Sequence, residues 1–396
     1  MIQTKSVYTF HSLPTMKYGV GALEEVGHLA QGFGSTVLVV SDPVMKSLGV
    51  VDNCLHHLHA QGLQTHVYVG VISEPVDTYV DEGLKLLRDT QCDVIVSIGG
   101  GSCIDTAKAI AVVATNGGYV GDYMKMQKIA AIRPVPHIAI PTTAGTGSEA
   151  TDATVITDIK NDIKMMIKQP AFMPNAAIVD PLLCLTSPKS ITAATGIDAL
   201  SHAIEGYLSR LAHPYSDLLA LSAMELIINN LLPSYEDGTN LTAREAMALG
   251  SMQAGAAFSN ASVALVHGMS RPIGALFHVP HGISNAMLLP AVLEYSKDAC
   301  IPRLAKIGAF FVGQETVSSY TEEQLADLAI DSVKDLCKQM NIDNLRQYGI
   351  DEDAFFQAID KMATDAIASG SPANNPKVPS LDDLKALYKI VYDYKF

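Results

Sequence analysis

The sequence predicts a chain of two parts, an α/β domain with a mostly parallel sheet and then an all-α domain. Length is the first reason, since 396 residues exceed the usual size of one domain. The second reason is a series of short apolar runs rich in Val and Ile, at 36–41, 65–70, 93–98, 137–140 and 177–180. Such runs suit strands that are buried on both faces of a parallel sheet. The third reason is that helical patterns dominate the chain after residue 185.

The elements of the first half alternate along the chain. Helical patterns at 43–62 and 77–90 separate the first three strands, which is the βαβ order of a sheet covered by helices. Residues 154–168 indicate instead a hairpin with a polar tip. From residue 191 the sequence is mostly helical, with breaks that contain Pro and Gly. The boundary is therefore expected near 185–190, which gives domains 1–185 and 186–396.

Composition and charge exclude several classes of partner. The formal net charge is −14 and no run is rich in Lys or Arg, so nucleic acid and anionic membranes are not expected partners. No apolar run is long enough to span a bilayer, and MIQTKSVYTFHSLP lacks the apolar core of a signal peptide. The six cysteines are scattered without a C-x-x-C pair. We therefore expect a reduced, cytoplasmic protein without a disulfide framework.

A glycine-rich loop follows the strand at 93–98. In SIGGGSCIDTAKAIA (97–111), three glycines precede a helix and permit a close backbone approach, namely Gly99, Gly100 and Gly101. We expect Ser102 to cap this helix, whose free N–H groups suit a phosphate. An ordinary tight turn between strand and helix is the alternative. Lys108 could add positive charge toward the anion or simply lie on the helix surface.

Two more polar loops follow predicted strands. Asp42 ends the strand at 36–41, where a carboxylate can hold ribose hydroxyls, although Asp followed by Pro is also a plain turn signal. PTTAGTGSEAT (141–151) offers the hydroxyl groups of Thr142, Thr143 and Thr146. The G-x-G-x-x-G fingerprint does not follow the first strand. Even so, three polar loops at one edge of a parallel sheet predict a dinucleotide crevice.

Metal-ligand residue types gather in the second half. Asp198 and His202 are four residues apart, so they share a face of a helix that is otherwise apolar. Taken alone, this pair could be a capping Asp and a satisfied core His. His267, His278 and His281 follow within one segment, and one carboxylate with three imidazoles could hold Fe²⁺ or Zn²⁺. The remaining histidine-rich segment, 56–66, has no matching carboxylate and indicates a solvated helix face.

These segments together resemble the iron-containing (group III, metal-dependent) alcohol dehydrogenases over nearly the full chain. The matching stretches occur in order at family-like separations: GGGSCIDTAK, PTTAGTGSEAT, AIVDP, ATGIDALSHAIEGY, REAMALGSMQAGAAFSN and LVHGMSRPIGALFHVPHGISNAMLLP. The resemblance implies a dehydroquinate-synthase-like fold, with an NAD-binding α/β domain and a helical metal-binding domain. It also implies that one divalent metal is bound by Asp198, His202, His267 and His281.

The resemblance further implies which residues contact the cofactor. Asp42 would hold the adenosine ribose and so favour NAD, because a carboxylate repels the 2′-phosphate of NADP. The pyrophosphate would lie on Gly99, Gly100, Gly101 and Ser102. Other lining residues would be Thr142, Thr143, Thr146, Lys164 and Leu183.

Two positions depart from the family pattern. Family members often carry His four residues after the third metal ligand, near the nicotinamide, whereas this chain has Arg271. Arg cannot act as a base near neutral pH, so a proton relay through this position is not expected. The loop after the second strand often reads Pro-Asn-Pro, and here it contains Glu74. An Asn contact to the cofactor is therefore not carried over.

The expected function is NAD-dependent and divalent-metal-dependent interconversion of alcohols with aldehydes or ketones. Hydride would pass in the cleft between the domains, where the metal polarises the alcohol oxygen and is held in part by His267 and His281. The proton would leave through His278 or the cofactor ribose, with His278 as a pocket wall the alternative. Phe258 would narrow the substrate pocket or belong to the core, and Arg271 could contact the substrate.

Three further expectations concern assembly and the alternatives to this function. We expect a homo-oligomer, a dimer or larger. One alternative function is a dehydroquinate-synthase-like lyase that uses bound NAD and metal, although several basic residues around the metal would then be needed. The other is a non-catalytic protein that binds a nucleotide or a metal.

Overall fold

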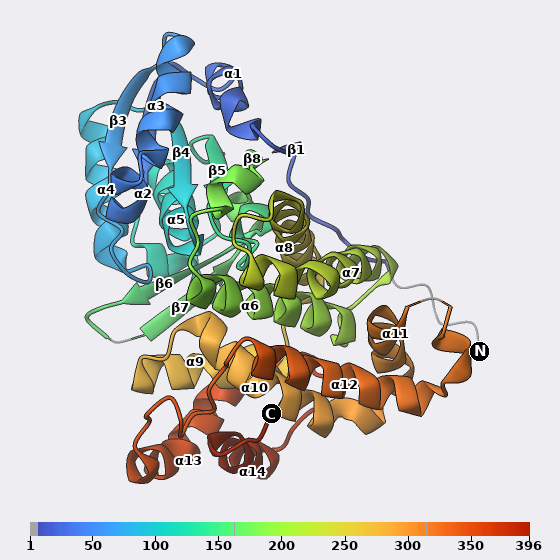
Figure 1. The fold of residues 1–396 in the computed structure, drawn as a ribbon. Helices are drawn as coiled ribbons and strands as arrows, with labels where there is room; N and C mark the ends of the chain where they lie inside the picture. The colour runs from blue at the N-terminus through green and yellow to red at the C-terminus, as the bar shows by residue number, and fades with distance from the viewer. Residues whose placement is uncertain (1–6, 162, 314) are drawn as a thin grey trace. The chain divides into compact units, whose positions relative to one another are not determined.

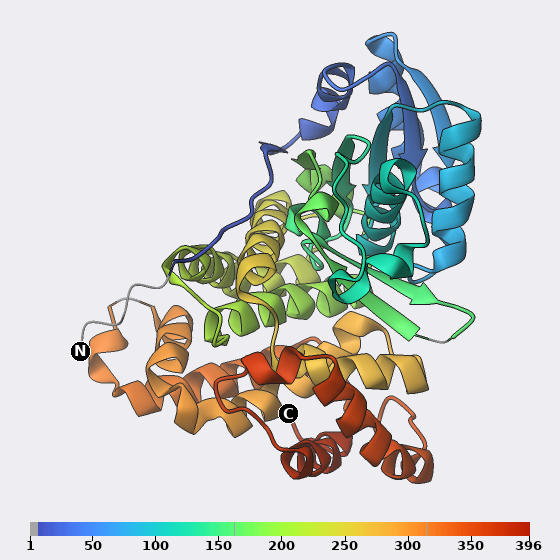
Figure 2. The same ribbon diagram turned by 180° about the vertical axis from the view of Figure 1, so that it is seen from behind.

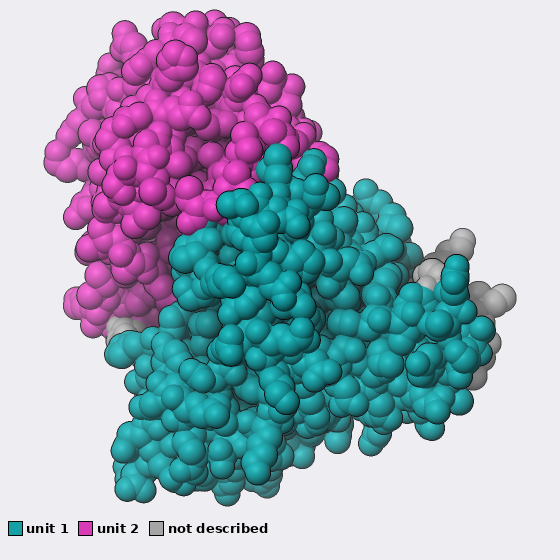
Figure 3. Space-filling view, viewed as in Figure 1, with its two compact units in different colours: residues 1–10, 187–396 teal, residues 11–186 magenta. Residues whose placement is uncertain are grey.

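A computed structural model describes residues 7–161, 163–313 and 315–396. The chain divides into two compact units, which Figure 3 colours separately. One unit is the segment 11–186. The other contains 187–396 together with residues 7–10, and the ring of Phe10 packs edge-on against that of Tyr215, with centroids 4.4 Å apart. The division thus falls within the Pro-containing segment 185–190.

The first unit is built on a six-stranded parallel sheet. Its strand order is β1-β8-β5-β4-β2-β3, and every strand pair in it is parallel. The strands are β1 (Thr15–Tyr18), β2 (Thr36–Val40), β3 (Gln64–Tyr68), β4 (Val94–Gly99), β5 (His137–Pro141) and β8 (Ala176–Val179). The five predicted strands are confirmed. The edge strand β1 was missed because its residues alternate between half-buried and exposed, so TMKY shows no apolar run.

Helices cover both faces of this sheet because successive residues of each strand point to opposite sides. On one face, Leu38 and Ile95 lie in a core with residues of α4 (Asp77–Asp89) and α5 (Gly101–Asn116). On the other face, Val37 and Val94 lie in a core with residues of α1 (Val26–Gln31) and α3 (Val50–Ala60). Figures 1 and 2 show these helices flanking the strands. Burial on both faces explains why the four inner strands, β8, β5, β4 and β2, are mostly apolar.

Two smaller elements of this unit bear on the cofactor loops. The short helix α2 (Pro43–Ser47) follows β2 directly and begins at Asp42, whose side chain caps it. The predicted hairpin is confirmed as β6 (Ala153–Asp158) paired antiparallel with β7 (Ile163–Lys168). Thr157 of this hairpin donates its N–H to the carbonyl of Pro75 at 2.8 Å, so the hairpin is tied to the loop after β3.

The second unit is entirely helical within the described residues. Its α-helices are α6 (Lys189–Leu208), α7 (Pro214–Glu236), α8 (Leu241–Ala261), α9 (Leu265–Phe277), α10 (His281–Ser296), α11 (Ile301–Val312), α12 (Glu322–Gln339), α13 (Glu352–Ala368) and α14 (Leu381–Tyr392). Helix α6 is its centre: residues 196–208 are all buried, and it packs against α7, α8 and α10. Close packing needs small residues here, since a Cβ on Gly196 would come within 2.2 Å of Cδ1 of Leu231. The α/β plus all-α architecture is therefore as predicted.

Among the described helices, α7 alone is long and apolar enough, by length and composition, to cross a membrane. Ala223, Met224 and Ile227 are buried where α7 packs against α6 and α8, whereas Tyr215 and Leu218 are exposed. Its start is also locally encoded, because His213 accepts the N–H of Ser216 and Pro214 occupies the first helical position.

Candidate metal centre

Four side chains from three helices converge in the helical unit. Asp198 and His202 lie one turn apart on α6, His267 is the third residue of α9, and His281 is the first residue of α10. Each offers one ligand atom, and these atoms all lie within 4.8 Å of one another. Three of the four residues are buried and His281 is half-buried. The structure therefore brings together the four residues that the sequence predicted as metal ligands, although α9 and α10 follow α6 by more than 50 residues.

The geometry within this cluster is close enough for a single cation to contact all four. Nε2 of His267 lies 3.6 Å and Nε2 of His281 lies 4.0 Å from Oδ1 of Asp198. The rings of His202 and His267 stack with centroids 4.5 Å apart. One carboxylate oxygen with three imidazole nitrogens is a donor set that suits Fe²⁺ or Zn²⁺. The residues present thus fit a divalent metal.

Electrostatics within the cluster favour charged groups despite their burial. Burial by itself would raise the pKa of Asp198, but nearby His202, His267 and His281 hold it well below its usual range. Burial by itself would lower the pKa of His267, but the charges of Glu205 and Asp198, together with hydrogen bonds to both, raise it to about 9. The carboxylates of Asp198 and Glu205 therefore stabilise positive charge at this buried position, either a proton on His267 or a metal ion that would replace it.

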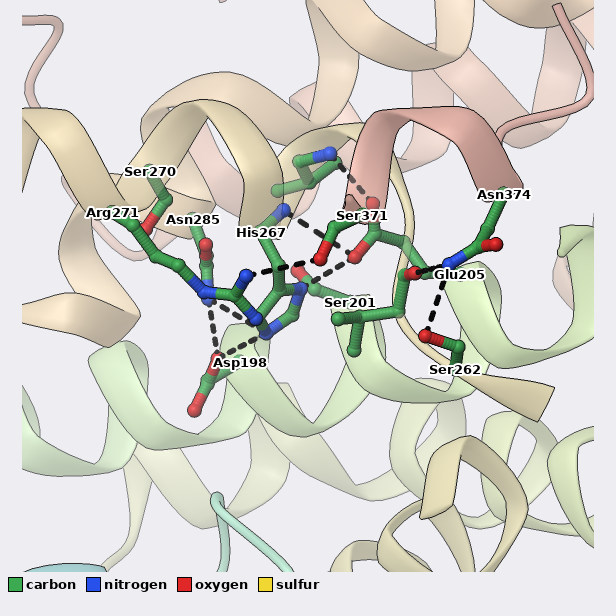
Figure 4. Close-up of polar contacts among 12 residues, drawn as sticks. Asp198, Ser201, Glu205, Ser262, His267, Ser270, Arg271, Asn285, Ser371 and Asn374 are labelled. Carbon is green, nitrogen blue, oxygen red and sulfur yellow. Dashed lines mark hydrogen bonds and ion pairs between the residues drawn. The ribbon is translucent and has the colours of Figure 1, made fainter. Parts of the chain in front are cut away.

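Two further buried side chains touch the cluster, and the sequence reasoning missed both (Figure 4). The amide nitrogen of Asn285 donates to Oδ1 of Asp198 at 2.7 Å and lies 3.1 Å from Nε2 of His267. Glu205, seven residues after Asp198 on α6, forms a hydrogen bond with Nδ1 of His267. The available signal was helical spacing: Glu205 follows His202 by three residues, and Asn285 follows His281 by four.

The structure also places the residues predicted near the substrate. The ring of Phe258 stacks on that of His202 with centroids 4.3 Å apart, so it lies against the metal cluster. Arg271, one helical turn after His267, donates from Nη1 to Oγ of Ser371 at 3.0 Å. Ser371 begins the short 3-10 helix η8 (Ser371–Asn374). His278 ends α9 with a left-handed φ of 54°; it is exposed and is not one of the four cluster residues.

The three predicted cofactor loops lie at the carboxyl ends of adjacent strands β2, β4 and β5. A Cβ on Gly101 would come within 2.7 Å of Cγ2 of Thr146, so only glycine allows these two loops to approach so closely. Asp42 accepts the N–H of Met45 at 2.9 Å through Oδ1, and the thiol of Cys103 lies 3.6 Å from its Oδ2. The sequence-predicted loops therefore form one edge of the sheet, the edge at which α/β proteins bind nucleotides.

The structure alters two local expectations, for Ser102 and Lys108, and gives the surroundings of Lys164 and Leu183. Helix α5 begins at Gly101 with Gly100 as its N-cap and no side-chain cap, so the expectation that Ser102 caps it was wrong. Lys108 is not on the surface: it is buried and donates to Oγ1 of Thr151 and to the carbonyl of Ala153. Lys164 pairs with Glu74 at 2.8 Å. Leu183 is buried in the core that α1 and α3 share with the sheet.

The chain is similar to known proteins over nearly its full length. The protein-family model described as "Iron-containing alcohol dehydrogenase" matches residues 14–181. A second family model, "Fe-containing alcohol dehydrogenase family, C-terminal", matches residues 192–392. The NAD-dependent methanol dehydrogenase of Bacillus methanolicus is 37% identical over 379 residues, covering 95% of this chain and 97% of that protein. The NADPH-dependent butanol dehydrogenase of Clostridium saccharobutylicum is 37% identical over 378 residues, covering 95% of each. The crystal structure of a 1,3-propanediol oxidoreductase superposes with a TM-score of 0.93 at 34% identity, covering 98% of this chain and all of that one.

Proposed function

The chain belongs to the iron-containing alcohol dehydrogenase family and is an NAD(P)-dependent, metal-dependent alcohol dehydrogenase, and we propose which of its residues carry that reaction. The observation that carries the proposal is the convergence of Asp198, His202, His267 and His281 on one point within 4.8 Å. Its expected reaction is the interconversion of alcohols with aldehydes or ketones. A lyase would need several cations around the metal, and Arg271, one helical turn after His267, is a single basic residue.

We propose that these four side chains hold one Fe²⁺ or Zn²⁺ ion. When bound, the ion acts as a Lewis acid toward the alcohol oxygen and so favours its ionised form. Among the four ligands only Asp198 is negatively charged, so its charge does not neutralise a divalent ion and the ion would stay electrophilic. Phe258 covers one face of His202 and excludes water from that side.

The cofactor contacts are proposed for the edge of the sheet where three loops meet. NAD supplies the hydride acceptor. The free N–H groups at the start of α5 suit its pyrophosphate, with Gly99, Gly100, Gly101 and Ser102 at that end. Asp42 takes the ribose hydroxyls and disfavours NADP. The remaining proposed contacts are Thr142, Thr143, Thr146, Lys164 and Leu183.

Two questions about the substrate side follow from the chemistry. The proton released from the alcohol needs a route to solvent, and we propose His278 or a cofactor ribose hydroxyl, with His267 and His281 acting as metal ligands. Arg271 stays charged near neutral pH, so we propose that it binds an acceptor atom of the substrate. We also propose a cytoplasmic location, since no disulfide joins any of the six buried cysteines. The homo-oligomer stays a prediction.

The test uses purified protein, NAD and a panel of primary alcohols, diols and secondary alcohols. The protein is first stripped of metal and then reconstituted with Fe²⁺ or Zn²⁺, and absorbance at the NADH band is followed. We expect turnover only after reconstitution. Equal turnover with and without metal would contradict the proposed centre, and no turnover with any alcohol would contradict the proposed substrate class.

A further inference from the structure

We propose that Glu205 is a positioning residue of the metal centre, which fixes the ring of His267 so that Nε2 faces the cation. The inference rests on the proposed metal centre, because His267 is one of its four ligands. Asp198, His202 and Glu205 are spaced by four and three residues on α6, so all three project from one face of that helix. Asp198 and His202 reach the cluster directly, whereas Glu205 reaches it through His267.

The contacts of Glu205 account for both of its carboxylate oxygens. Oε1 accepts the N–H of Val266 at 2.6 Å. Oε2 accepts the N–H of His267 at 3.4 Å and is hydrogen-bonded to Nδ1 of the same residue. Glu205 is only 3% exposed, so these contacts replace water almost completely. Figure 4 shows the carboxylate against the first turn of α9.

The position of these donors gives Glu205 a structural role as well. Val266 and His267 lie in the first turn of α9, where backbone N–H groups have no partner within the helix. The N-cap residue, Ala264, has no side chain that could accept them. A carboxylate from another helix therefore caps α9, and the same carboxylate holds the ring of the ligand that α9 carries. The start of the helix and the orientation of the imidazole are thus set by one group.

The tautomer of His267 follows from this contact. A carboxylate only accepts hydrogen bonds, so Nδ1 must carry a proton. In the neutral ring the free lone pair is then on Nε2, the atom that lies 3.6 Å from Asp198. Metal-binding histidines commonly donate their second ring N–H to a carboxylate, which orients the ring and makes the ligand more basic. Glu205 has the position and the chemistry for this role.

The test measures metal binding in three variants of the full chain. Glu205→Gln keeps the size of the side chain but removes its charge. Its amide oxygen can accept N–H groups, whereas its amide NH2 can only donate, so the three N–H groups lose one of their two acceptor atoms. Glu205→Asp keeps the charge but shortens the reach. The matched control is Asp180→Asn, since Asp180 is also a buried carboxylate that accepts backbone N–H groups, from Gly21, Leu23 and Leu182. Asp180 lies in the α/β unit and touches no metal ligand.

The readouts are the Kd for Zn²⁺, from competition with a chromogenic chelator, the visible absorption spectrum of the Co²⁺-substituted protein, and the melting temperature of the metal-free protein. We expect Glu205→Gln to weaken Zn²⁺ binding by roughly 10- to 100-fold and to alter the Co²⁺ spectrum. Glu205→Asp should give a smaller loss. The control Asp180→Asn should lower the melting temperature while leaving the Kd and the spectrum at wild-type values.

A wild-type Kd and Co²⁺ spectrum in Glu205→Gln would overturn the proposal and leave Glu205 as a helix cap only. If Glu205→Gln does not fold, Glu205→Asp decides in the same way. These measurements need neither alcohol nor NAD, so they do not depend on the reaction. Failure of the metal centre itself would be seen separately, as undiminished Zn²⁺ binding in His202→Ala.

Discussion

Nζ of Lys164 lies 2.8 Å from Oε2 of Glu74, so an ion pair joins the hairpin β6–β7 to the loop after β3. The family resemblance assigns Lys164 to the cofactor and leaves Glu74 as a departure from the usual Asn. The structure brings these two positions together. The carboxylate of Glu74 partly neutralises the positive charge of Lys164. Glu74 should therefore weaken the attraction between Lys164 and a bound cofactor.

We therefore predict that Glu74→Asn strengthens NADH binding. Because the pair is partly exposed, its free energy is small, about 0–1 kcal/mol, and the expected decrease in Kd is no more than about fivefold. NADH fluorescence titration measures it. Glu82→Gln is the control. Glu82 is an exposed carboxylate that accepts a hydrogen bond from the hydroxyl of Tyr68, so this variant removes one negative charge at a different position. Weaker NADH binding in Glu74→Asn would show that Glu74 itself contacts the cofactor.

The second prediction concerns the metal ligands. His202→Ala should lower metal content and activity together, with kcat/KM reduced by roughly 100-fold or more, because three ligands hold the ion less tightly and less well oriented. Metal content per chain is measured after dialysis, beside kcat/KM for the best alcohol. His56→Ala, which changes an exposed histidine on α3, should alter neither. Full metal retention in His202→Ala would remove His202 from the ligand set.

The third prediction concerns the choice between NAD and NADP. Asp42 should make NAD the preferred cofactor, and Asp42→Asn should narrow the preference because it removes the charge while it keeps an oxygen that can cap α2. Asp42→Gly should narrow or reverse the preference as well, at a cost of a few tenths of a kcal/mol in cap stability. The ratio of kcat/KM for the two cofactors is the measurement. A wild type that uses NADP more efficiently would place Asp42 away from the ribose.

The fourth prediction concerns Arg271, whose observed partner is the hydroxyl group of Ser371. Arg271→His should introduce a group that titrates near pH 6.5, so kcat/KM should fall by about tenfold per unit well below that pH. Arg271→Lys keeps a charge without titrating in this range, so its profile should follow the wild type. Profiles of kcat/KM against pH that superimpose for all three proteins would exclude residue 271 from proton transfer and substrate binding.

The fifth prediction concerns stability in acid. Burial lowers the pKa of His137 from 6.5 to about 3, and its Nδ1 has no hydrogen-bond partner that could accept a proton. The unfolded chain therefore binds a proton below pH 6.5 that the folded chain binds only near pH 3. The contribution of His137 to the free energy of unfolding is therefore fully present above pH 6.5. As the pH falls from 6.5 toward 3, the free energy of unfolding decreases by at most about 1.4 kcal/mol per pH unit.

Replacement of His137 by Gln tests this effect, since Gln does not titrate and can still bond to Oγ of Ser97, which lies 2.8 Å from Nε2 of His137. Urea unfolding of both proteins between pH 4 and 8 gives the difference in stability at each pH. As the pH falls below 6.5, the free energy of unfolding of His137→Gln should increase relative to that of the wild type. A difference that does not change with pH would mean that His137 has the same pKa in the folded and the unfolded protein.

Much of this protein is determined by patterns that are local in the sequence. Strands buried on both faces are apolar along most of their length, so the four inner strands could be predicted, together with the edge strand β3, and helical spacing placed Asp198 beside His202. Glycine and threonine loops that follow strands indicated the nucleotide edge. In each case the physical cause acts within a few residues, through the two-residue period of a strand or the 3.6-residue period of a helix.

Other features were decided only by the tertiary structure, because their cause is packing between distant segments. The half-exposed strand β1 is defined by its pairing with β8, some 160 residues later. Lys108 has an ordinary helical sequence context, yet it is buried because α5 packs on Thr151, which ends the loop 141–151, and on Ala153, the first residue of β6. Glu205 and His267 are 62 residues apart, and their contact exists because α6 meets the first turn of α9. Periodicity tells which side chains share a face of a helix, but which partner meets that face depends on how all the helices pack together.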